Sequence, residues 1–184
     1  MRAMQPAEPQ PRRPARGAGS PEAPPPTVIV RHRRERVSKC SLEPLRGRPD
    51  LVFVTYPDEQ PPALAGYVRL ALHGPPLSRA DAGCGLLLLD ASWRLVRPME
   101  RRYREVPARS LPPLATAYPR SSKLAPDPPG GLASVEALFA AYWILGRPTA
   151  GLLEHYRWRE PFLAHNRALL QQLRADRSGG SPER

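Results

Sequence analysis

Four consecutive leucines, Leu86–Leu89, lie between Gly85 and Asp90 and constrain the fold more than any other stretch of the chain. A strand that is apolar at every position must be buried on both sides, because successive residues face opposite ways. Such strands occur inside parallel sheets whose two faces are both covered by helices. The leucine run therefore predicts a buried strand in an α/β fold.

Three further segments have the length and composition of strands. Thr27–Val30 and Leu51–Tyr56 are rich in β-branched and aromatic residues, and Pro57 closes the second of them. Tyr67–Leu72 is the third, although a short helix starting at Pro62 is an alternative. Strands separated by connecting segments favour a mainly parallel sheet, which we expect in the N-terminal half.

The C-terminal half is predicted to be mostly helical. Apolar residues recur at helical spacing over residues 134–145, and Gly146 and Pro148 then provide a stop signal. Further helices are expected over residues 94–105, 149–156 and 160–174.

These patterns divide the chain into four parts. Residues 1–26 contain many prolines and little apolar bulk, so we expect a disordered tail there, and a second one over residues 177–184. Residues 27–93 form the expected α/β part. Residues 94–176 form the expected helical part.

The chain is strongly basic, with a formal charge of +11 and an isoelectric point of about 10.7. Clustered arginine at such a value is typical of nucleic-acid binding, while an anionic membrane surface or an acidic partner are alternatives. Arg97, Arg101 and Arg102 form a basic strip in the expected helix over residues 94–105. This strip either faces RNA or is an ordinary solvated helix face.

Several classes of function are disfavoured by features that the sequence lacks. It has no apolar run approaching about 18 residues and no apolar signal-peptide core, so we expect no membrane association. Cys40 and Cys84 lack zinc-ligand spacing and the four histidines are scattered, so we expect no metal site. The expectation is a cytoplasmic protein with reduced thiols.

Asp90, Ser92 and Trp93 directly follow the leucine run. In open parallel sheets, ligands bind just beyond the carboxyl ends of the strands. The sequence thus places a carboxylate and an indole where a cofactor would lie. The alternative is that Asp90 caps the next helix and Trp93 packs into the core.

Five short motifs follow one another along the chain. They are Ser38–Ser41, Asp90–Trp93, Arg109–Ala115, which is similar to R-x-LP-x-L-x-A, Leu132–Leu138 (L-x-x-VEAL) and Tyr156–Asn166, which is similar to F-x-W-x-x-x-FL-x-x-N. Together they resemble the ribosomal small-subunit rRNA aminocarboxypropyltransferases, in which Asp90–Trp93 corresponds to D-C-S-W. The resemblance covers residues 28–174 and implies a SPOUT-like fold with a trefoil knot. It also implies a relation to the DTW-domain tRNA aminocarboxypropyltransferases.

The resemblance implies transfer of the 3-amino-3-carboxypropyl group of S-adenosylmethionine to a uridine-type base, with ribosomal RNA or a small-subunit precursor as partner. Asp90 would be the general base or an electrostatic aid, and the Trp93 indole would wall the methionine arm of the cofactor. Ser92 would bind the cofactor carboxylate or simply cap the helix. The remaining cofactor-binding candidates are Leu72, Leu89, Leu114, Leu132 and Ala137.

The chain departs from the family pattern in two places. Tyr118–Ser122 replaces N-P-x-N-Y-G and a longer loop follows to Gly131, which leaves the acceptor nucleotide open. Ala91 replaces a cysteine, which argues against a catalytic thiol at that position. The alternatives are a SPOUT-type methyltransferase, a tRNA aminocarboxypropyltransferase and a noncatalytic RNA-binding assembly factor.

Overall fold

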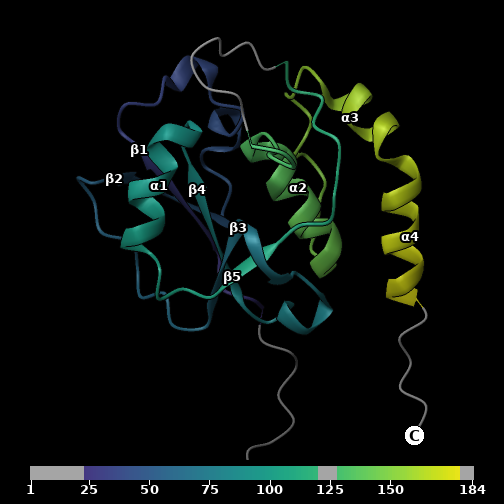
Figure 1. Cartoon of the computed structure of the whole chain (residues 1–184), viewed down its shortest axis with the longest axis horizontal. Coiled ribbons are helices and arrows are strands. Elements are labelled where there is room, and N and C mark those ends of the chain that lie inside the picture. The colour runs from purple at the N-terminus through teal and green to yellow at the C-terminus, as the bar shows by residue number, and fades with distance from the viewer. Residues whose placement is uncertain (1–22, 120–127, 179–184) are drawn as a thin grey trace, which may run out of the picture.

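The structure, a computed structural model, describes residues 23–119 and 128–178 and contains a five-stranded sheet (Figure 1). The strand order is β2-β1-β4-β3-β5, and neighbouring strands are parallel throughout. The predicted parallel α/β fold is therefore confirmed, and the segment from Tyr67 is a strand. The strands are β1 (Thr27–His32), β2 (Leu51–Tyr56), β3 (Tyr67–Pro76), β4 (Gly85–Asp90) and β5 (Ala108–Ser110).

β4 is the central strand of the sheet, as its leucine run predicted. Leu86 and Leu88 belong to the larger hydrophobic cluster on one face, while Leu87 and Leu89 belong to a second cluster on the other. Each of the four is at most 8% exposed. Full burial of a leucine contributes about 1.5–3 kcal/mol, so the run stabilises this strand only in the middle of the sheet.

Helices cover both faces of the sheet (Figure 1). The helix α1 (Trp93–Arg102) packs on the face of Leu87 and Leu89, and α2 (Ser134–Leu145) packs on the opposite face. α2 has the predicted bounds and ends at Gly146, whose φ of 72° is left-handed and favours glycine. The remaining helices are α3 (Arg159–His165), α4 (Arg167–Ser178) and the short 3-10 turns η1 (Val37–Lys39), η2 (Glu43–Leu45) and η3 (Arg79–Asp81).

The helix predicted over residues 149–156 is wrong. Residues 150–155 form turns, and Gly151 has a φ of 78°, which a continuous right-handed helix does not allow. Leu152 and Leu153 are nevertheless buried in the larger cluster. Their apolar character reflects packing of a loop into the core.

The helix predicted over residues 160–174 is two helices that meet at Asn166. The Asn166 side chain donates to the carbonyl oxygen of Phe162 at 2.8 Å and exchanges two hydrogen bonds with the backbone of Ala115. This competition between side chain and backbone accounts for the interruption. α4 also continues to Ser178, into the predicted C-terminal tail.

The remaining tail predictions lie mostly outside the described residues. Residues 1–22 and 179–184 belong to this part, and residues 23–26 are exposed and have no regular structure. Among the described residues, no helix has the length and apolarity needed to cross a membrane.

Candidate functional site

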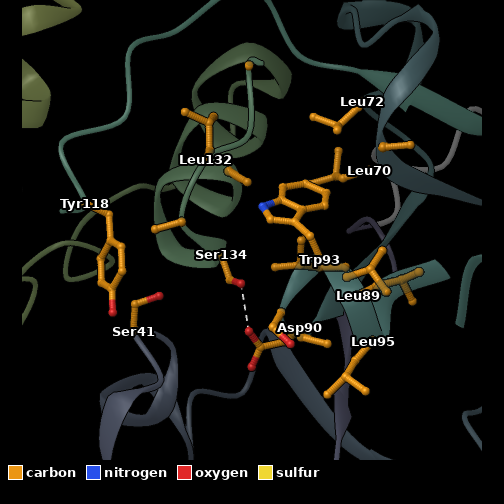
Figure 2. A pocket seen from close by; sticks show the side chains of 18 of the residues that line it. Ser41, Leu70, Leu72, Leu89, Asp90, Trp93, Leu95, Tyr118, Leu132 and Ser134 are labelled. Carbon is orange, nitrogen blue, oxygen red and sulfur yellow. Dashed lines mark hydrogen bonds between the residues drawn. The ribbon is translucent and has the colours of Figure 1, made fainter. Parts of the chain in front are cut away.

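A cavity of about 810 Å³ opens at the carboxyl edge of the sheet. It is lined by the middle of β3, the ends of β4 and β5 and the first turns of α1 and α2 (Figure 2). β1 leads to β2 on one side of the sheet, while its neighbour β4 leads to β5 on the other. Adjacent strands whose connections diverge in this way form the topological switch point where open α/β sheets bind ligands.

Asp90 lies at this point and is 6% exposed. Its Oδ2 accepts hydrogen bonds from Arg31 Nε at 2.9 Å and from the Cys40 thiol at 3.0 Å. Its Oδ1 accepts from Ser134 Oγ at 2.7 Å, the bond dashed in Figure 2. The carboxylate therefore joins the end of β1, the loop after it and the start of α2.

The charges around Asp90 are set by burial and by pairing. Burial, together with the negative charge and the hydrogen bond of Asp90, raises the pKa of the Cys40 thiol to about 12. Burial by itself lowers the pKa of Arg31. The hydrogen bonds that Arg31 donates to Glu43 and Asp90 outweigh this effect, so the pKa of the guanidinium is raised. The thiol is protonated and the guanidinium charged at neutral pH, so both act as fixed donors.

Trp93 is the first residue of α1 and forms one wall of the cavity, with Leu70 and Leu72 beside it (Figure 2). Gly131 lies against the indole, because a Cβ at this glycine would stand 2.8 Å from Trp93 Cζ2. Leu132 and Ala137 complete an apolar surface on the side of α2. Apolar side chains thus line the cavity beside Trp93 and along α2.

The wall segment that carries Tyr118 is held by two buried polar side chains. The carboxylate of Glu136, 0% exposed, accepts hydrogen bonds from Thr116 Oγ1 and from the N–H of Ala117, at 2.6 and 2.8 Å. Asn166 pairs with the backbone of Ala115 through two bonds of 2.8 Å. Glu136 of the VEAL motif and Asn166 of the FL-x-x-N motif thus hold this wall in position, although neither residue lines the cavity.

Most of the predicted site residues meet at this one cavity, which is lined by Leu72, Leu89, Asp90, Ser92, Trp93, Leu132 and Ala137. Ser92 occupies the N-cap position of α1, but its hydroxyl makes no capping bond. Its backbone N–H donates to Glu35 instead, at 2.6 Å. Asp90 does not cap α1 either, because its partners are Arg31, Cys40 and Ser134.

Leu114 does not line the cavity. Its side chain is 4% exposed and packs into the larger hydrophobic cluster, although the neighbouring Pro112 and Pro113 do line the wall. The Leu114 side chain thus faces the core in this structure, and its contact with a cofactor stays a prediction.

The basic strip divides over two sides of α1. Arg97 and Arg101 line a second hollow of about 420 Å³. Arg102 points elsewhere, donating to Gln60 at 3.4 Å and lying over the Tyr103 ring. The helical period also predicts this division. Arg97 and Arg101 are four residues apart and share a face of the helix, whereas Arg102 is five residues from Arg97 and does not.

Sequence reasoning missed Arg31 and Ser134 as site residues. Arg31 directly follows the predicted first strand and lies inside β1 in the structure, and its contact with Asp90 depends on β1 and β4 being neighbours. Ser134 was visible as the first residue of a predicted helix. Among the described residues, no group of three or more His, Cys, Asp or Glu side chains is placed to bind a metal ion.

These features define an α/β protein with a ligand cavity at the switch point of a parallel sheet. The chain belongs to the family described as ribosome biogenesis protein, C-terminal, whose model matches residues 75–179, more than half of the sequence.

A solved structure has the same fold: the SAM-dependent rRNA:acp-transferase Tsr3 from Vulcanisaeta distributa. It matches with a TM-score of 0.63 and 23% sequence identity, over 82% of this chain and 84% of that chain. No curated protein sequence matches the chain.

Proposed function

We propose that this protein transfers the 3-amino-3-carboxypropyl group of S-adenosylmethionine to a uridine-type base of ribosomal RNA during ribosome biogenesis. The observation that carries the proposal is one cavity lined both by Asp90–Trp93 and by Leu132, Ala133, Ser134 and Ala137. The resemblance assigns these separate motifs to one cofactor site. The shared fold with a SAM-dependent rRNA:acp-transferase supports the same activity.

The cavity suits this cofactor. Its volume of about 810 Å³ lies within the roughly 300–1,000 Å³ of small-molecule sites. Leu72, Leu132 and Ala137 offer an apolar surface for adenine, and backbone groups of Leu89 would hold the ribose. The Trp93 indole would lie beside the methionine arm, where cation–π attraction to a sulfonium contributes about 0.5–2 kcal/mol.

The bound cofactor supplies an electrophilic methylene carbon beside its sulfonium. The residues around it must hold that methylene, and not the methyl group, in line with the acceptor nitrogen at about 3–3.5 Å. Trp93 and the wall built on Gly131 and Leu132 would set this orientation. Ser92, exposed at the N-cap of α1, would bind the cofactor carboxylate.

Asp90 takes an orienting or electrostatic role in this proposal. Among the described residues, Arg31, Cys40 and Ser134 use three of the four acceptor positions of its carboxylate. The remaining position, on Oδ1, can receive a proton or a hydrogen bond from the acceptor base. The geometry favours fixed negative charge over a freely moving general base.

An anionic acceptor is favoured by the rim of the cavity. Arg34, Arg36 and Arg94 line it and are exposed. Arg97 and Arg101 extend the positive surface along α1, and we assign these two, but not Arg102, to RNA.

The finer expectations remain part of the proposal. They are a SPOUT-like classification with a trefoil knot, a relation to the DTW-domain tRNA enzymes, a cytoplasmic location and the division at residues 93 and 94. The parallel sheet with its cavity at the strand ends is compatible with the first of these.

The reaction product tests the function. Incubation with S-adenosylmethionine and small-subunit rRNA should release methylthioadenosine, and Trp93→Ala should weaken cofactor binding in calorimetry. Release of S-adenosylhomocysteine would instead identify a methyltransferase. Absence of cofactor binding at millimolar concentration would leave a noncatalytic RNA-binding factor. Mass spectrometry of rRNA and tRNA nucleosides from a deletion strain then identifies the acceptor.

A further inference from the structure

A second hollow, of about 420 Å³, lies beside the cofactor cavity. Glu100 lines both, so the two are adjacent. We call this second hollow the basic hollow, since four of its six lining residues are arginines. It is lined by Arg69, His73, Arg97, Glu100, Arg101 and Arg104.

Arg69 is the unusual member of this group. It is 4% exposed on β3, and within residues 23–119 and 128–178 its side chain makes one hydrogen bond, of 3.3 Å, to Glu100. Its Nε is buried and has no hydrogen-bond partner among the described residues. A guanidinium has five N–H donors, and a buried cation that is incompletely paired costs several kcal/mol. A bound anion at this place would offset that cost.

The other arginines widen the positive surface. Arg97 and Arg101 are exposed and lie one turn apart on the same face of α1. Arg104 is paired with Glu105 at 3.0 Å, so its charge is partly used. Glu100 is the single acidic residue of the lining, which leaves a clear excess of positive charge.

We propose that the basic hollow binds a phosphate group of the RNA backbone next to the acceptor nucleotide. Arginine forks match phosphate oxygens in two-bond geometry, and Arg69 is held in place by its burial. Because Glu100 lines both spaces, a phosphate held here would position the acceptor strand against the cofactor cavity. This inference rests on the proposed function for the identity of the RNA.

The test compares two double variants that remove the same charge. Arg97→Gln with Arg101→Gln changes the basic hollow. Arg102→Gln with Arg167→Gln is the matched control, because Arg102 is on the same helix but outside the hollow and Arg167 is exposed on α4. The affinity for a labelled single-stranded RNA that contains uridine is measured by fluorescence anisotropy over a range of salt concentrations.

The hollow variant should bind RNA about tenfold more weakly, and its log–log salt slope should fall by about one unit, as expected for the loss of one phosphate contact. The control variant should keep most of the RNA affinity and most of the salt slope of the unmodified protein. Equal losses in the two variants would overturn the proposal, because diffuse surface charge would then explain the binding.

Titration with inorganic phosphate distinguishes the source of the anion. In the full-length protein, phosphate should shift the imidazole NMR signals of His73 and compete with RNA. A shift of His73 together with unchanged RNA affinity in the hollow variant would overturn the assignment to RNA and indicate a free-phosphate site.

Calorimetry with S-adenosylmethionine separates this proposal from the function on which it rests. The hollow variant should bind the cofactor like the unmodified protein. If neither binds the cofactor, the proposed function fails, while the difference in salt slope between the two variants still decides the phosphate site.

Discussion

Arg31 and Asp90 are partners across the parallel strands β1 and β4, and their side chains meet at 2.9 Å with less than a tenth of either exposed. Their contact joins two strands whose connections diverge, which is the place where the cavity forms. Arg31 also pairs with Glu43, and Cys40 donates to Asp90, so one buried ion pair organises the loop after β1. The following predictions start from this arrangement.

Replacing Arg31 with methionine should lower the free energy of unfolding by about 3–5 kcal/mol, because it leaves the Asp90 carboxylate buried without its cation. Urea denaturation measures the loss. Arg33→Met is the control, since its pair with Asp58 is half exposed and contributes at most about 1 kcal/mol. Similar losses in the two variants would contradict an organising role for the buried pair.

Asp90→Asn should reduce the release of methylthioadenosine without changing the shape of its pH–rate profile. The amide keeps the size of the carboxylate but removes the charge that faces Arg31 and places an N–H₂ group against existing donors. Loss of stability of about 1–3 kcal/mol should accompany it. Disappearance of an acidic limb from the profile would instead identify Asp90 as the general base, whose removal typically costs about 10²–10⁴-fold in rate.

Gly131→Ala should weaken S-adenosylmethionine binding by about tenfold while the protein remains folded. The new methyl group would stand 2.8 Å from Trp93 Cζ2, so the indole must move, and a misplaced wall loses cation–π and packing contacts. Gly83→Ala is the control, because a Cβ there meets no atom within 4 Å. Calorimetry that finds equal affinity for the two variants would show that the position of the indole is unimportant.

Stability should fall as the pH rises from about 9 to about 12. The Cys40 pKa is raised from an ordinary 9.0 to about 12 by burial and by Asp90, so unfolding releases its proton within this window. The stabilisation from the protonated thiol is complete below pH 9 and is lost as the pH approaches 12.

Cys40→Ala should remove part of this dependence, measured as the difference in free energy of unfolding between pH 8 and pH 10.5. Burial also raises the pKa values of Tyr103 and Tyr142, so a residual slope is expected. Cys84→Ala controls for the loss of a thiol. An unchanged difference in Cys40→Ala would contradict the assignment.

Local sequence patterns determined four of the five strands, the bounds of α2 and the position of Asp90–Trp93 at the end of a buried strand, but not the short strand β5. These features depend on residues that are close in sequence. A strand buried on both faces is apolar at every position, and a helix buried on one side is apolar at helical spacing. The resemblance of the motifs added the expected cofactor and singled out Leu132 and Ala137, which line the same cavity as Asp90 and Trp93.

Only the tertiary structure decided which groups meet. Arg31 and Asp90 are 59 residues apart, and their contact follows from strand order and register, which a hydrophobic period does not encode. The same holds for Gly131 against Trp93. For Leu152 and Leu153, core packing of a loop produced an apolar pattern that resembled a helix. Burial favours apolar residues, but which residues bury one another, and which polar groups are paired in the interior, depends on the whole fold.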